Sequence, residues 1–103
     1  MKLFYTELAR NDLRTLRDYI ARENSQAAVT TSRYIRSRLH DLAILPLTGR
    51  SGRLMGTREL FMRRHPYVAV YEVDRAAATV VILRVLHTRQ DWPRMTGPSP
   101  DAR

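Results

Sequence analysis

The sequence predicts an α+β fold in the order β-α-α-β-β-β, with an N-terminal strand and a helical hairpin packed on an antiparallel sheet. In the first half of the chain, apolar residues recur at helical spacing, whereas the second half holds β-prone runs separated by turns. At 103 residues the chain has room for one compact domain. We expect that domain over residues 1–93. Residues 94–103, with a glycine and two prolines, are predicted to form a disordered C-terminal tail.

The first strand and the first helix are predicted at the N-terminus. Residues 2–5 are expected to form a short strand, after which Thr6 can cap a helix that carries Glu7 in its first turn. The apolar residues that follow fall on one helical face, at Ala9, Leu13, Leu16 and Ile20. The pattern stops near residues 23–25, which sets the end of this helix.

A second helix follows at once. Asn24 or Ser25 can cap it. One face again collects small and apolar side chains, at Ala28, Ser32, Ile35, Leu39 and Leu42. We expect Pro46 to end this helix, because the residue before a proline is pushed out of the α region. Two amphipathic helices with so short a link predict an antiparallel helical hairpin.

The rest of the chain changes to strand patterns. Residues 47–56 hold three glycines and are expected to form a loop, and residues 57–63 can be extended. Residues 67–73 and 79–86 are β-prone, and the second of these runs is apolar at both parities, which favours a central strand buried on both faces. Three such strands with short links predict an antiparallel meander. Two helices cover one face of it, so apolar surface is left over for a binding partner.

The charge is strongly basic. Eighteen Lys and Arg against ten Asp and Glu give a net +8, and seventeen of the eighteen are arginine. Residues 1–45 carry eight basic and five acidic groups, and residues 46–103 carry ten and five. This excess favours an acidic partner, which could be nucleic acid, the ribosome or an acidic protein; arginines on solvated faces from an arginine-rich genome are the alternative. The densest run lies in the second half, at Arg50, Arg53, Arg58, Arg63 and Arg64.

Some classes of protein are excluded by composition. The absence of cysteine excludes a disulfide scaffold and any thiolate metal site, and it fits a reducing compartment. No apolar run approaches the length of a membrane span, and the N-terminus lacks a signal-peptide core. We therefore expect a cytoplasmic protein with no membrane association, no metal and no cofactor.

Several segments, taken in order, resemble the ParE/RelE superfamily of toxins from type II toxin–antitoxin systems. The resemblance covers residue 3 to about residue 93 and is closest to the ParE branch. It is carried by the segments 8–13, 19–20, 45–46, 49–50, 56–60, 67–68, 71–73 and 82–87. It implies a RelE/ParE-like fold and a cognate antitoxin whose acidic C-terminal segment is disordered alone and folds on the toxin in a hetero-oligomer.

The resemblance implies two targets. ParE-like toxins trap DNA gyrase and are not nucleases, whereas RelE-like toxins cut mRNA in the ribosomal A site. The first predicts a gyrase poison that arrests growth and stabilises plasmids. The second, kept as the alternative, predicts a metal-independent endoribonuclease that acts on the ribosome. A direct nucleic-acid-binding module is a third possibility, and it predicts salt-sensitive binding to naked DNA or RNA.

The candidate site residues separate these targets. RNA cleavage without metal needs a base, an acid and cations, which Arg84 and His87 could supply. Strand alternation places His87 with Val81, Leu83 and Val85, and Arg84 on the other face, while the chain has neither a tyrosine after His87 nor a lysine beyond Lys2. Both residues also have structural readings: a backbone or Asp91 bond for His87, and a salt bridge or antitoxin contact for Arg84. The gyrase reading is therefore preferred. Candidate contacts to a target or antitoxin are Arg50, Arg53, Arg58, Arg63, Tyr71, Arg84, His87 and Trp92.

Overall fold

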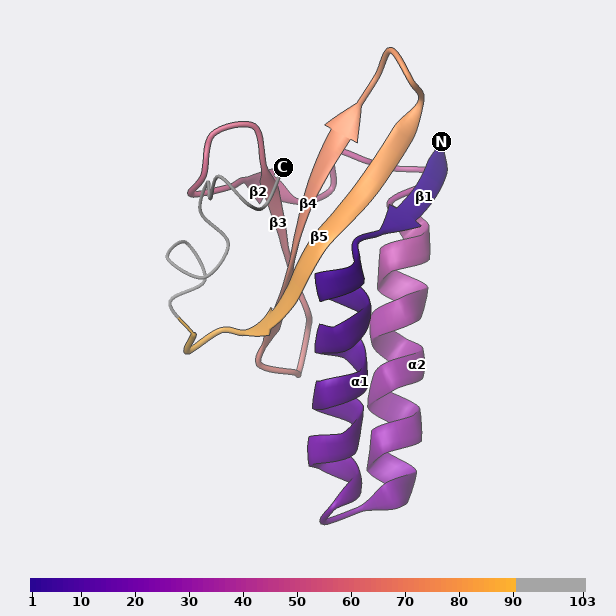
Figure 1. The fold of residues 1–103 in the computed structure, drawn as a ribbon, viewed down its shortest axis with the longest axis vertical. Coiled ribbons are helices and arrows are strands. Elements are labelled where there is room, and N and C mark those ends of the chain that lie inside the picture. Colours follow the sequence, from indigo (N-terminus) through magenta and orange to yellow (C-terminus); the bar gives the residue numbers. More distant parts are fainter. Residues whose placement is uncertain (91–103) are drawn as a thin grey trace.

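A computed structural model describes residues 1–90 as a helical hairpin packed on one face of a five-stranded sheet (Figure 1). The elements in chain order are β1 (Lys2–Tyr5), α1 (Glu7–Ala21), α2 (Ser25–Asp41), β2 (Arg50–Ser51), β3 (Arg58–Phe61), β4 (Tyr67–Asp74) and β5 (Thr79–His87). The predicted α+β class and the order of elements are confirmed. The tail predicted over residues 94–103 and Trp92 lie outside the described residues.

The sheet has the strand order β1-β5-β4-β3-β2 and is mixed. Strands β3, β4 and β5 form the predicted antiparallel meander. The N-terminal strand, for which the sequence predicts no pairing, makes the sheet mixed: β1 pairs with β5 in parallel, from Lys2 opposite Thr79 to Tyr5 opposite Ile82. A parallel pair needs a long crossover connection, and the helical hairpin together with β2–β4 supplies it. The short strand β2, in the predicted loop, adds a further edge by pairing with β3.

Both helices begin at the predicted caps. The Thr6 hydroxyl accepts a hydrogen bond from the Ala9 N–H at 3.0 Å, and the Asn24 side-chain oxygen accepts one from the Ala27 N–H at 2.9 Å. The expected end of α2 at Pro46 was wrong, since the helix stops at Asp41. The chain tightens there into turns in which successive N–H groups donate three residues back, as an α-helix commonly does at its end.

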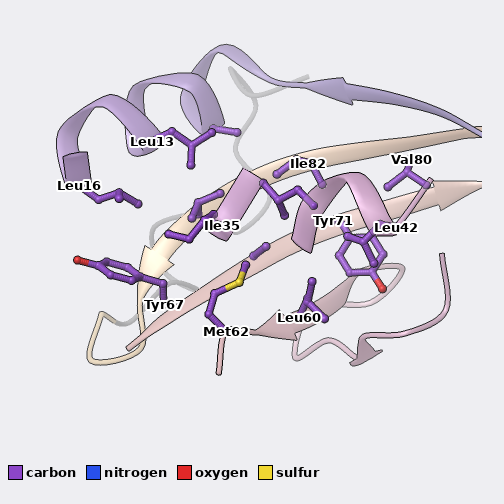
Figure 2. Packing of buried hydrophobic residues seen from close by; sticks show 14 residues of the cluster. Leu13, Leu16, Ile35, Leu42, Leu60, Met62, Tyr67, Tyr71, Val80 and Ile82 are labelled. Atoms are coloured by element: carbon purple, nitrogen blue, oxygen red, sulfur yellow. The ribbon is translucent and has the colours of Figure 1, made fainter. Parts of the chain in front are cut away.

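The main core lies between the helices and the sheet. Leu13 and Leu16 of α1 and Ile35 of α2 face Tyr67 and Ile82 of the sheet (Figure 2). On the opposite face, a smaller buried cluster joins β4 to β5 and is packed against two half-buried leucines; it comprises Val68, Val70 and Leu86, with Leu54 and Leu83. The central strands are therefore covered on both faces, as the apolar run over residues 79–86 predicts.

A β-bulge interrupts the alternation along β5. Val70 pairs with Arg84 and Tyr71 pairs with Ile82, so Leu83 is an extra residue that has no paired residue on β4. Past the bulge, Val85 belongs to the core beneath the helices, and His87 pairs with the core residue Tyr67. The expectation that His87 faces away from Ile82 was therefore wrong, because the extra residue reverses the parity.

Candidate functional site

Arg84 forms a buried ion pair with Asp12 of α1. The Arg84 Nε donates to Asp12 Oδ2 at 2.8 Å and its Nη2 to Oδ1 at 3.0 Å, in the two-point geometry that guanidinium and carboxylate favour. Asp12 Oδ2 also accepts from the Val85 N–H at 2.9 Å. Strand β1 ends at Tyr5, so among residues 1–90 no strand pairs with this edge of β5 beyond Ile82, and the Asp12 carboxylate accepts the Val85 N–H there instead. Arg84 therefore fastens α1 to the sheet.

His87 lies at the end of β5 and is held by local hydrogen bonds. Its N–H donates to the Gln90 side-chain oxygen at 2.8 Å, and its Nδ1 accepts from the Arg89 N–H at 3.0 Å. Its ring stands edge-on to Tyr67, with the ring centroids 5.6 Å apart. Arg84 and His87 thus have their observed partners on different elements. Asp91, the other partner considered for His87, lies outside the described residues.

The phenol ring of Tyr67 lies against the imidazole ring of His87. Burial, and to a lesser extent the nearby Tyr19, raise the pKa of Tyr67 above 10.0. The phenol therefore stays protonated near neutral pH and can donate a proton or a hydrogen bond, but it cannot act as a base. A tyrosine directly after His87 was the signal sought in the sequence. The tyrosine that contacts His87 is instead Tyr67 on the neighbouring strand β4. Pairing residues outward from the β4–β5 turn would have placed Tyr67 within one residue of His87.

Arg50 and Arg53 surround a fully buried carboxylate on the sheet face opposite the helices. Glu59 pairs with Val70, whose side chain belongs to the cluster on that face. Glu59 Oε2 accepts from the Arg53 N–H at 2.8 Å and from Arg53 Nε at 3.4 Å. Arg50 places a guanidinium nitrogen 3.7 Å from Glu59 Oε1 and stacks its charge over the Phe61 ring at 4.5 Å. Both arginines keep about half or more of their side chains exposed to solvent.

Arg58 and Tyr71 hold the loop that leads into β2. Arg58 donates to the carbonyls of Gly49 at 3.0 Å and Leu47 at 3.3 Å. The Tyr71 hydroxyl donates to the Pro46 carbonyl at 2.7 Å and accepts from the Gly49 N–H at 2.9 Å. A Cβ at Gly49 would come within 2.6 Å of that hydroxyl, so the close approach requires glycine. Tyr71 is fully buried, which keeps its side chain out of a partner's direct reach in this conformation.

The remaining candidates lie at the other end of the sheet or beyond the described chain. The side chain of Arg63 is exposed next to the β3–β4 turn, and its N–H donates to the Tyr34 hydroxyl at 3.1 Å. Among residues 1–90, no three histidine or carboxylate side chains gather as a metal site would require. Within the same range, no helix is long and apolar enough to cross a membrane. The described site residues therefore divide into an α1–β5 ion pair, a loop anchor, two exposed arginines beside Glu59 and the exposed Arg63, with His87 apart from them.

Sequence comparisons identify relatives over most of the chain. Residues 3–92 match the family model described as the ParE toxin of the type II toxin–antitoxin system parDE. A protein of Sinorhizobium fredii named "Putative toxin Y4kP" is 36% identical over 77 residues, which are 75% of this chain and 77% of that protein.

Solved structures with the same fold come from toxin–antitoxin systems. The chromosomal ParDE system of P. aeruginosa superposes with a TM-score of 0.74 at 26% identity, over 84% of this chain and 95% of that chain. The RelBE2 toxin–antitoxin complex of Mycobacterium tuberculosis gives a TM-score of 0.54 at 34% identity, over 84% of this chain and 88% of that chain. The fold and the residue pattern thus lead to the same group of proteins.

Proposed function

The chain belongs to the ParE toxin family of type II toxin–antitoxin systems, and from that premise we propose that it arrests growth by binding and poisoning DNA gyrase. It is the toxin component of such a system, and a cognate antitoxin neutralises it. The observation that carries the choice of gyrase is the placement of Arg84, the cation that a ribonuclease reading would put at the reacting phosphate.

The Asp12–Arg84 contact ties that cation to a structural role. Both nitrogens of Arg84 that face Asp12 donate to its carboxylate, and the same carboxylate holds the Val85 N–H. A guanidinium that stabilises a phosphorane must offer its donors to the phosphate oxygens instead. Opening the pair for that purpose would leave the nearly buried Asp12 carboxylate without its arginine, which is costly. This geometry supports a protein-binding toxin over a nuclease.

The exposed arginines supply the binding chemistry. Arg50 and Arg53 each place a guanidinium nitrogen near Glu59, yet about half or more of each side chain stays exposed to solvent. Arginine is enriched where protein interfaces have their strongest contacts. A net charge of +8 also speeds encounter with an acidic partner. We therefore place the gyrase contact on the loop and strand that carry these two side chains.

A neutralising partner is supported by the structural relatives, two of which are described as a ParDE system and a RelBE2 toxin–antitoxin complex. The basic charge suits an antitoxin segment that is acidic, and such a segment, disordered alone, would order itself on the toxin.

A ribosome-dependent mRNA endonuclease is the second candidate, favoured by one specific observation. The Tyr67–His87 pair puts a protonated phenol beside an imidazole at the end of the last strand. An imidazole can accept or donate a proton in catalysis, and the protonated phenol can donate one. This reading requires His87 to act without Arg84.

Two assays run on the same purified toxin separate the candidates. One measures supercoiling and the cleavage complex of DNA gyrase, and the other measures ribosome-dependent cleavage of mRNA. We expect the wild type and His87→Ala to inhibit gyrase equally. The double variant Arg50→Ala, Arg53→Ala should inhibit it only weakly. In all three cases mRNA should remain intact. Cut mRNA with unaffected gyrase, abolished by His87→Ala, would instead assign the endonuclease function.

A further inference from the structure

Four large apolar side chains lie exposed where α2 leads into the loop before β2. Ile44 is 80% exposed and Leu45 64%, and Leu47 and Met1 are each nearly half exposed. Met1 joins them because its terminal ammonium donates to the Ala43 carbonyl at 2.8 Å. Met1, Ile44, Leu45 and Leu47 are called the apolar corner below. Contiguous exposed apolar surface of this kind marks an interaction site.

The loop that carries the apolar corner is held by hydrogen bonds to its carbonyls. The Leu45 carbonyl accepts from the N–H and hydroxyl of Thr48. The Pro46 carbonyl accepts from buried Tyr71, and the Leu47 carbonyl accepts from Arg58. These hydrogen bonds satisfy the loop carbonyls and fix the backbone, while the side chains of Ile44, Leu45 and Leu47 stay exposed. A surface fixed in this way loses little further conformational entropy when a partner binds.

Two hollows adjoin the apolar corner and share Leu45 and Thr48 in their walls. One, of about 170 Å³, lies between the end of α2 and Leu60. The other, open and of about 540 Å³, lies beside Met1 and Leu47 and reaches Arg75 in the β4–β5 turn. Neighbouring hollows in a mostly apolar surface can each take an apolar side chain from one short segment.

The rim of the two hollows is basic. Arg38 lines the smaller hollow and Arg75 the larger one, and the terminal ammonium of Met1 lies between the loop and α2. Among residues 1–90, Asp41 is the one carboxylate that lines them; it shares the smaller hollow with Arg38, so the positive excess lies mainly at the larger hollow. A segment that fits both the apolar walls and the rim must therefore carry apolar side chains flanked by carboxylates.

We propose that the apolar corner binds an acidic, apolar-anchored segment of the cognate antitoxin. This proposal rests on the proposed function, because it takes the antitoxin as given. It assigns to the corner a contact separate from Arg50 and Arg53, which lie on the far side of β2 and β3 from the helices. The antitoxin's apolar side chains enter the two hollows, and its carboxylates face Arg38 and Arg75.

The test is antitoxin affinity measured on folded variants. The antitoxin used as probe is the neighbouring gene product whose co-expression restores growth to cells that make the toxin. Ile44→Asp and Leu45→Asp each place a charge in the apolar corner. The control, Val29→Asp, places one at an exposed apolar residue near the start of α2, at the end of the helix away from the corner. Circular dichroism and thermal unfolding confirm that each variant folds, as expected for side chains so exposed. We expect each corner variant to weaken antitoxin binding at least about thirtyfold, the scale of an interface hot spot. Val29→Asp should change it less than about threefold.

Each other outcome overturns the proposal in a distinguishable way. Wild-type affinity in both corner variants would show that the antitoxin binds elsewhere. Loss of toxicity with antitoxin binding intact would assign the corner to the growth-arrest target. A change from dimer to monomer in light scattering, again with binding intact, would assign it to a second copy of this chain. If the wild type does not arrest growth, or if the neighbouring gene product neither restores growth nor binds the toxin, the proposed function itself fails.

Discussion

Two arginine–carboxylate contacts in this chain use the same chemistry and leave their arginines in opposite situations. In the inner contact, Asp12–Arg84, both side chains are nearly buried, at 13% and 10% exposure, and the closest atoms are 2.8 Å apart. In the outer contact, Glu59 is fully buried, whereas its partners Arg50 and Arg53 are 68% and 51% exposed at 3.7 and 3.4 Å. The inner contact holds its guanidinium within the fold, whereas the outer contact leaves both of its guanidinium groups largely exposed to a partner.

The difference shows why the basic excess does not by itself locate a binding surface. A net charge of +8 counts Arg84 and Arg50 equally, although a partner can reach one far more readily than the other. What separates them is the carboxylate each one meets and the element that carries it. Asp12 comes from α1, beside the part of β5 that β1 does not reach, and Glu59 comes from a strand next to an exposed loop.

The largest expected effect is the loss of the inner carboxylate. Asp12→Ala removes the carboxylate that two nitrogens of the nearly buried Arg84 contact, and it takes the acceptor from the Val85 N–H. We expect the free energy of unfolding in urea to fall by about 3–5 kcal/mol. Asp18→Ala, which removes an exposed partner of Arg17, is the control and should cost less than about 1 kcal/mol. Equal losses in the two variants would mean that burial does not distinguish the contacts.

Glu59→Gln tests the outer contact from its buried side. The amide keeps the shape and an oxygen for the Arg53 N–H, but it loses the negative charge and adds donors where Glu59 Oε1 has no hydrogen-bond partner. We expect about 1–2 kcal/mol of destabilisation and faster proteolysis of the loop before β3. Glu23→Gln, at an exposed position, should stay within about 0.5 kcal/mol of wild type. A loss as large as that of Asp12→Ala would erase the comparison.

Much of the fold could be predicted because it depends on neighbours in sequence. The caps at Thr6 and Asn24 act on N–H groups three residues later, and the meander follows from short turns between β-prone runs. The parallel pairing of β1 with β5 could not be predicted in the same way. It joins residues more than seventy positions apart, and no local pattern records which strand edge remains open.

The candidate site was less predictable for the same reason. The extra residue Leu83 reverses the parity of β5, so simple alternation fails just where His87 is to be placed. Tyr67 reaches His87 across the ladder, and Asp12 reaches Arg84 from a helix, neither of which is marked by spacing. Tyr71 is a conspicuous aromatic in the sequence, yet its role is to hold Pro46 and Gly49.

Alkaline pH should lower the stability of the fold through two tyrosines and leave both arginine–carboxylate contacts charged. Arginine side chains in proteins do not deprotonate, so both contacts persist. Burial raises the pKa of Tyr5 and Tyr67 above 10.0, although Arg36 partly offsets this for Tyr5. The folded state therefore binds these protons more tightly than the unfolded state. The stability they contribute is full below pH 10.0 and is lost as the pH rises through their folded pKa values. Tyr67→Phe should flatten that decline in urea titrations at successive pH values, and Tyr19→Phe, at an exposed position, should flatten it less. An unchanged decline in Tyr67→Phe would contradict the assignment.

The smallest expected effect on stability is the removal of the outer guanidinium groups. Arg50→Ala and Arg53→Ala each lose a long, largely solvated ion pair, and Arg50→Ala also loses the contact over Phe61. We expect each to lower the free energy of unfolding by no more than about 1 kcal/mol. If their charges serve a partner rather than the fold, gyrase inhibition by the same proteins should fall well beyond what that small loss explains. A variant that unfolds like Asp12→Ala would show instead that the outer arginines, like Arg84, belong to the structure.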